Sequence, residues 1–150
     1  MADKLVWSAS RDGQVPKDAV NGGWDASTGE PLFVGRANHG GALIVGKIHP
    51  SHRCIYVPFG GGEHKHQDYE ALVNPRNQVK LEWIHRKNGN VPNGAVPGGR
   101  DSSGEVYYIG RHSHRGDTLP GKVHQSHQCL YICVGGKEIS KKEYNVLVAE

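Results

Sequence analysis

Polar residues that could bind or transform a ligand occur in this sequence as matched pairs, about 75 positions apart. A repeated glycine or apolar residue is explained by a turn or by the core, whereas a repeated Asp, Arg or Lys needs a partner inside or outside the chain. These pairs are therefore the first candidates for a functional site. The pairs are Asp25/Asp101, Arg36/Arg111, His39/His114, Lys47/Lys122, His49/His124, His52/His127 and Glu63/Glu138.

The aspartates and lysines have the chemistry of a sugar site. Asp25 and Asp101 come shortly after a Gly-Gly pair, and Lys47 and Lys122 each follow a glycine in an apolar stretch. A sugar hydroxyl both donates and accepts hydrogen bonds, so a carboxylate and an ammonium can each engage one of two vicinal hydroxyls. The alternatives are an Asx-turn for the aspartate and a solvent-facing strand position for the lysine.

Further side chains are expected to line these two candidate sites. The indole of Trp24 could stack on the apolar face of a sugar, whereas Arg100 at the equivalent place would do so less well. Arg36 and Arg111 are instead expected to form internal ion pairs, either with the repeated glutamates or with another carboxylate. The additional candidate site residues are Trp24, His52, His127, Glu63 and Glu138.

The sequence gives little support to catalytic chemistry. The pairs His64/His66 and His112/His114 could bind zinc, but neither pair repeats and no Cys-x-x-Cys accompanies them, which favours surface histidines. Cys54 opens an apolar run, which favours a buried thiol over a nucleophile. No nucleophile elbow, P-loop or dinucleotide fingerprint is present. We therefore expect no catalytic residue, metal or cofactor, and two equivalent weak sites suit avidity.

These residues are positioned by an internal repeat. Gly22-Gly23-Trp24-Asp25 matches Gly98-Gly99-Arg100-Asp101, and the stretch from His49 to Cys54 matches that from His124 to Cys129. One residue is lost in the polar turn after Asp25, where an insertion or deletion costs least. The chain thus divides into a first repeat over 1–75 and a second over 76–150, joined near Val73 to Lys80.

Composition and pattern predict an all-β fold. Glycine makes up 21 of 150 residues, about twice the usual share, which favours short strands joined by tight turns. We expect the two β-rich repeats to be related by a pseudo-twofold axis and packed as one compact molecule. The expected strands are 5–8, 31–37, 42–48, 54–59 and 69–73, with partners at 81–85, 106–112, 118–124, 129–134 and 144–148.

Bulk properties narrow the partners. The net charge of +3 is spread along the chain, without the basic runs of nucleic-acid binders. No apolar run approaches a membrane span, and the first residues have no signal-peptide core, so we expect a cytoplasmic protein, with unconventional secretion or cell-surface display left open. An odd count of three cysteines indicates reduced thiols. Leu5-Val6-Trp7 could be exchanged with a second subunit in a homodimer.

The repeated motifs resemble a known family, the DM-nine repeat, over nearly the whole chain from Trp7 to Leu147. The resemblance implies a tandem pair of β-rich repeats, often dimeric. It also implies a calcium-independent lectin of invertebrate innate immunity that binds mannose and mannose-bearing microbial surfaces through the aspartate and lysine positions above. The shared motifs are Trp, Val-Pro, Ala-Val, Gly-Gly-x-Asp, Gly-Arg, Gly-Lys-Ile/Val-His, Ser-His, Cys-x-Tyr, Gly-Gly-x-Glu and Tyr-x-x-Leu.

Two hypotheses follow. The first is a mannose-type lectin with one site per repeat, made by Asp25 and Lys47 and by Asp101 and Lys122. The second is a non-enzymatic scaffold or protein-interaction module, such as the targeting part of a larger pore-forming system. Binding on a glycan array separates the two.

Overall fold

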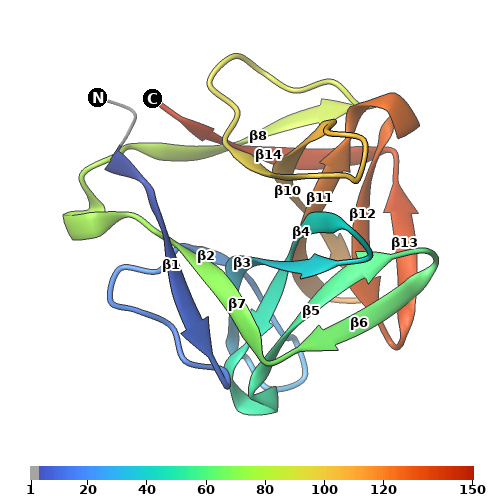
Figure 1. Cartoon of the computed structure of the whole chain (residues 1–150). Helices are drawn as coiled ribbons and strands as arrows, with labels where there is room; N and C mark the ends of the chain where they lie inside the picture. Colours follow the sequence, from blue (N-terminus) through green and yellow to red (C-terminus); the bar gives the residue numbers. More distant parts are fainter. Residues whose placement is uncertain (1–3) are drawn as a thin grey trace.

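The computed structural model describes residues 4–150, and nearly all of its regular structure is β-strand (Figure 1). In this part of the chain no helix is long and apolar enough to cross a membrane. Three short 3₁₀ turns are η2 (Pro50–His52), η3 (Pro75–Asn77) and η4 (Gln125–His127). The strands are β1 (Val6–Arg11), β2 (Asn21–Trp24), β3 (Pro31–His39), β4 (Ala42–His49), β5 (Cys54–Phe59), β6 (Gly62–His66), β7 (Asp68–Val73), β8 (Leu81–Lys87), β9 (Pro97–Arg100), β10 (Val106–His114), β11 (Asp117–His124), β12 (Cys129–Val134), β13 (Lys137–Lys141) and β14 (Glu143–Ala149).

The ten expected strands are all present, and the all-β prediction is confirmed. Four strands were not expected: β2, β6 and their counterparts β9 and β13. Their sequences are rich in glycine or charged residues, so they lack the apolar alternation that marks a strand.

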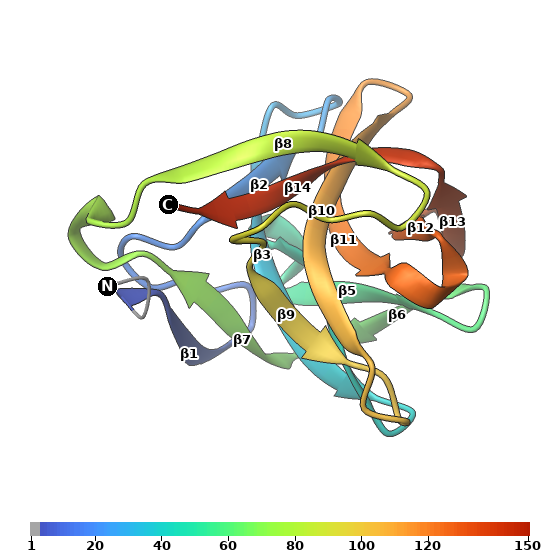
Figure 2. The ribbon, with the colours of Figure 1, turned by 90° about the horizontal axis from the view of Figure 1, so that it is seen from above.

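The strands form one sheet that closes on itself. Its order is β1-β7-β3-β2-β11-β12-β13-β6-β5-β4-β9-β10-β14-β8, and the further pairings β3–β4 and β10–β11 complete the closure. Figure 2 shows the strands wrapped around a common interior. Closure leaves β1 and β8 as the two edges, so few backbone groups lack a sheet partner.

The two repeats are intercalated along this sheet. β2 of the first repeat pairs with β11 of the second, and β9 of the second pairs in the same way with β4 of the first. Between them β6 and β13 meet at Gly62 and Lys137, and Figure 1 shows the green and orange-red strands side by side. Blocks of strands from the two halves therefore alternate along the sheet.

The core is shared in the same way. One buried cluster combines Val34 and Leu72 of the first repeat with Ile109 and Leu147 of the second. Neither repeat alone encloses these side chains, which suits the small core that a unit of this size can form.

Glycine before each candidate lysine is required by the sheet. A Cβ atom on Gly46 would lie 2.1 Å from the carbonyl oxygen of Tyr56 on the neighbouring strand, and one on Gly121 would lie 2.1 Å from that of Tyr131. Only glycine allows this close approach of β4 to β5 and of β11 to β12. The Gly-Lys pairs thus fix where the lysines enter the interior.

The N-terminal strand is paired within the single chain. Val6 and Trp7 lie in β1, which pairs along its whole length with β7 of the same chain. The guanidinium of Arg36 lies 4.0 Å from the centroid of the Trp7 ring, which helps hold β1 in place. The exchange of Leu5-Val6-Trp7 and the homodimer both stay predictions, because an exchanged β1 would make the same pairing with β7 of a second subunit.

Candidate functional site

A cavity of about 280 Å³ lies between the two repeats, beside the first candidate lysine. It is near the lower end of the range for small-molecule sites, roughly 300–1,000 Å³. Four predicted residues, Asp25, Lys47, His52 and Glu63, line it together. The complete lining is Asp25, Leu32, Lys47, His49, His52, Tyr56, Glu63, Asp117, Leu119, Val134 and Gly135.

Lys47 is the most buried charged group of this cavity. Its ammonium donates to the carbonyl oxygen of Cys133 at 2.6 Å and lies 3.0 Å from Oε2 of Glu63. The two charged side chains are only 7% and 11% exposed. An ammonium has three N–H donors. Within residues 4–150, Cys133 and Glu63 take two of them, and the third is left for a ligand in the cavity.

The sequence left open a solvent-facing strand position for the two lysines. This alternative is wrong, because Lys47 and Lys122 are buried. The internal ion pair expected for Arg36 is present, and its partner is another carboxylate rather than the repeated Glu63: Nε of Arg36 lies 2.7 Å from Oε1 of Glu70. Arg111 has no glutamate at the corresponding place, where the chain has Asn145, and its guanidinium lies 4.2 Å from the centroid of the Trp83 ring.

Asp25 caps its own turn and also faces the cavity. Its Oδ1 accepts hydrogen bonds from the backbone N–H and the hydroxyl of Ser27, which is the Asx-turn considered as an alternative. Its Oδ2 lies 3.1 Å from Nε2 of His49. The hydrogen bond from the Ser27 hydroxyl has the largest effect, and together with the contact to His49 it lowers the pKa of Asp25 to about 2. The carboxylate therefore stays ionised and keeps acceptor capacity for a hydroxyl group.

Two histidines and a tyrosine form one wall. The rings of His49 and His52 are stacked, with centroids 3.6 Å apart, and Nδ1 of His52 lies 2.9 Å from the hydroxyl of Tyr56. Burial, followed by the charge of His49, lowers the pKa of His52. A neutral His52 can act as donor or acceptor, as can the hydroxyl of Tyr56.

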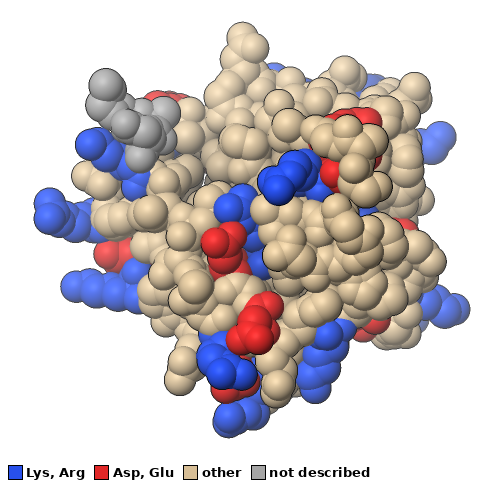
Figure 3. All heavy atoms as spheres, in the orientation of Figure 1, with Lys and Arg blue, Asp and Glu red and all other residues tan. Residues whose placement is uncertain are grey.

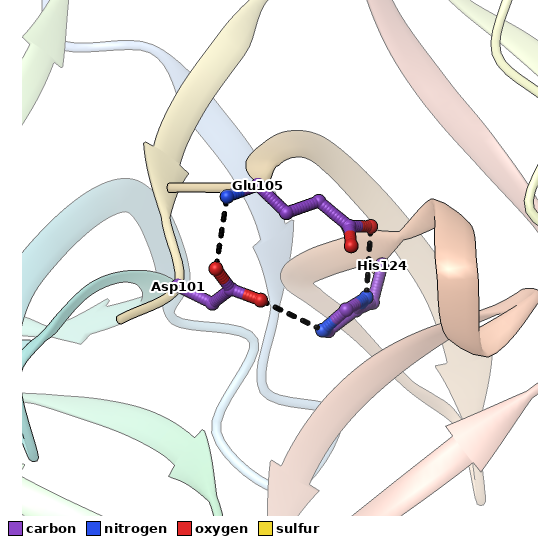
Figure 4. A group of neighbouring side chains, drawn as sticks. All are labelled: Asp101, Glu105 and His124. Atoms are coloured by element: carbon purple, nitrogen blue, oxygen red, sulfur yellow. Dashed lines mark hydrogen bonds and ion pairs between the residues drawn. The ribbon is translucent and has the colours of Figure 1, made fainter. Parts of the chain in front are cut away.

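The second repeat repeats this polar arrangement. Nζ of Lys122 lies 3.2 Å from Oε2 of Glu138, and the rings of His124 and His127 stack at 3.6 Å. Figure 4 shows His124 held between Asp101 and Glu105, with its two ring nitrogens 3.6 Å and 3.2 Å from the carboxylates.

Asp101, Glu105 and His124 are the group of described residues closest to a metal-ligand set, with one ligand atom from each lying within 4.8 Å of the others. However, Asp101 Oδ1 already accepts hydrogen bonds from Ser103 N, Ser103 Oγ and Glu105 N. Glu105 Oε2 accepts from the N–H of Ser126, and Nδ1 of His124 lies 3.3 Å from the hydroxyl of Ser126, so these groups already have partners within the chain. The group holds the turn at Asp101 to Glu105 against η4.

Other residues singled out in the sequence lie outside the cavity. Trp24 precedes Asp25 but does not line the cavity, and its side chain is 47% exposed, so it is not placed to stack on a ligand there. His64 and His66 are partly buried rather than on the surface, and they cluster with His39, whose Nδ1 lies 3.0 Å from Nε2 of His66. Cys54, Cys129 and Cys133 are buried free thiols, as expected.

The sequence did not indicate the residues that the second repeat contributes to the first cavity. Asp117, Leu119 and Val134 reach it because β2 pairs with β11 and β6 with β13. Asp117 accepts a hydrogen bond from the N–H of Ala26 at 2.7 Å, which fixes the Asp25 turn. Its counterpart in the first repeat is Ala42, so no repetition marked it.

Fold and site together define a closed all-β protein of two intercalated repeats, with a small cavity at their junction that combines charged groups with an apolar wall. The chain belongs to the DM9 repeat family, whose model matches residues 1–66 and 55–141. The family resemblance seen in the sequence is thereby confirmed.

Known relatives are larger proteins. The chain is 32% identical to natterin-4 of Thalassophryne nattereri over 136 residues, covering 91% of this chain and 32% of that protein. It is 33% identical to Protein unzipped of Drosophila melanogaster over 127 residues, covering 79% and 24%. The chain therefore spans a third or less of these curated relatives. The nematode sperm cell motility protein MFP2B shares the fold, with a TM-score of 0.70 at 14% identity over 97% of this chain and 47% of that one.

Proposed function

We propose that this chain is a calcium-independent lectin that binds mannose-type sugars and recognises microbial glycans in innate immunity. The observation that carries the proposal is the cavity at Lys47, where the predicted Asp25, His52 and Glu63 converge. Membership of the DM9 repeat family supports it, since the sequence resemblance implies mannose binding at these aspartate and lysine positions.

The cavity offers the two kinds of contact that a pyranose needs. Lys47 donates and Asp25 accepts, so two neighbouring hydroxyls can each be engaged. Leu32, Leu119 and Val134 supply an apolar wall for the C–H face of the ring. Since the ammonium supplies the positive charge, hydroxyl binding requires no calcium.

The charge distribution favours a neutral ligand over a polyanion. Figure 3 shows Lys and Arg interspersed with Asp and Glu on the face viewed, without a continuous basic area. A nucleic-acid site usually concentrates basic side chains on one face.

Calorimetric titration of mannose in the presence of EDTA tests the proposal. The variant to compare with the unmodified protein is Val134→Phe. It introduces a phenylalanine, the residue that the first repeat carries at the equivalent position 59, and so narrows the cavity. The expected result is binding by the unmodified protein and at least tenfold weaker binding by the variant. Heats of dilution alone from the unmodified protein, with no signal on a glycan array, would favour a protein-interaction module instead.

A further inference from the structure

The two sites share the repeated polar groups, though Asp117 of the first site has Ala42 as its counterpart, and their apolar walls differ. With the offset of 75, Leu32 of the first cavity corresponds to Tyr107 in the second site, and Val134 corresponds to Phe59. Both differences place a large ring in the second site where the first site has an aliphatic side chain.

These rings stand over the second lysine. Nζ of Lys122 lies 5.1 Å from the ring centroid of Tyr107, 5.5 Å from that of Phe59 and 5.3 Å from that of Tyr131. Around Lys47 the equivalent of Tyr131 is Tyr56, at 5.4 Å. Burial lowers the pKa of Lys122, which agrees with an ammonium covered by rings.

Phe59 is fixed in this position by its neighbours. A Cβ atom on Gly40 would lie 2.8 Å from Cζ of Phe59, so the ring packs directly on that backbone. The ring of His39 lies at 5.2 Å from it and stacks on His64 at 4.1 Å. The second repeat has Ile139 in place of His64, so the wall of the first site at Val134 lacks this support.

Tyr107 is fixed as well. Its side chain is 2% exposed and belongs to a buried cluster against which Phe59 also packs. Its ring lies 5.3 Å from that of His124. Swinging such a ring out of a packed cluster would forfeit its contacts, so the ring is not a gate that a ligand could easily open.

We propose that Tyr107 and Phe59 close the second site, so that the chain carries one open sugar site, at Lys47. Leu32 and Val134 are then the residues that keep the first site accessible. The Lys122–Glu138 pair has the same polar chemistry but acts as a buried ion pair that stabilises the core. This inference rests on the proposed sugar-binding function.

Calorimetric titration with mannose tests the proposal through stoichiometry. The expected result is one sugar per chain, at least tenfold weaker binding in Val134→Phe, and a second sugar per chain in Phe59→Val/Tyr107→Leu. Two sugars of similar affinity in the unmodified chain would overturn the proposal, as would unchanged stoichiometry in a folded Phe59→Val/Tyr107→Leu protein.

A second measurement does not depend on sugar. Truncating a packed ring leaves a void, whereas trimming the wall of an open cavity does not, so Phe59→Val is expected to lower the melting temperature more than Val134→Ala. Equal melting temperatures would contradict closure. A chain that binds no glycan but shows the expected melting temperatures would refute the proposed function while retaining the closed second site.

Discussion

Replacing Lys47 by Met tests how the buried ion pair stabilises the barrel. Methionine retains an unbranched apolar stem, so little packing volume is lost. The change removes the donor to Cys133 and the cation facing Glu63, whose side chain is 11% exposed. Removing one partner of a buried ion pair costs about 3–5 kcal/mol. Glu63 still accepts from the N–H of Gly136 at 2.9 Å, so we expect a loss near the lower end of that range.

Urea denaturation at pH 7 measures this loss as the free energy of unfolding. Adding Glu63→Gln removes the uncompensated charge, so the double variant should recover about 1 kcal/mol relative to Lys47→Met alone. The matched control is Lys80→Met, because Lys80 is 75% exposed and lies 3.6 Å from Glu150. That surface pair should contribute less than about 1 kcal/mol. Equal losses for Lys47→Met and Lys80→Met would refute a stabilising role for the buried pair.

Four further predictions concern the histidines, Asp25, the sheet and the thiols. Burial lowers the pKa of His39 and His66 from the ordinary 6.5, so the unfolded chain binds more protons below that pH, and chemical denaturation should show stability falling from about pH 7 to 5; a flat profile would contradict this. The stability that the ionised Asp25 contributes is fully present above its ordinary pKa of 3.8 and should be lost as the pH falls toward its folded pKa of about 2. Asp25→Asn should abolish this pH-dependent loss of stability. Gly46→Ala should lower the melting temperature sharply, because its Cβ would meet a backbone carbonyl, whereas Gly60→Ala, with no atom within 4 Å, should cost only its left-handed backbone strain. The three cysteines should react with a thiol reagent only after unfolding, since burial raises each pKa, and labelling of the folded chain would refute this.

The strands that follow ordinary patterns could be predicted from the sequence. β5 and β12 begin and end where their apolar runs do, because both are buried and bounded by turns. β6 and β13 could not be predicted, because their charged sequences lack an apolar pattern and they form by pairing with β5 and β12, the preceding strands of their own repeats. Propensity carries no information about such a partner.

The candidate site was predicted in part. Repetition selected Asp25, Lys47 and Glu63, and the structure gathers them around one cavity. Repetition could not show that Lys47 is buried, because a lysine in a strand usually faces solvent. Nor could it indicate Asp117 or Val134, since intercalation of the repeats brings them from the other half of the chain.

The central claim is that a sugar occupies the cavity beside Lys47, and a crystal structure of the protein soaked with mannose tests it most directly. The expected result is density for one pyranose in that cavity, with hydroxyl oxygens about 2.7–3.2 Å from Nζ of Lys47 and from a carboxylate oxygen of Asp25 or Glu63. An empty first cavity at saturating mannose, or a sugar bound only at another surface, would contradict the claim.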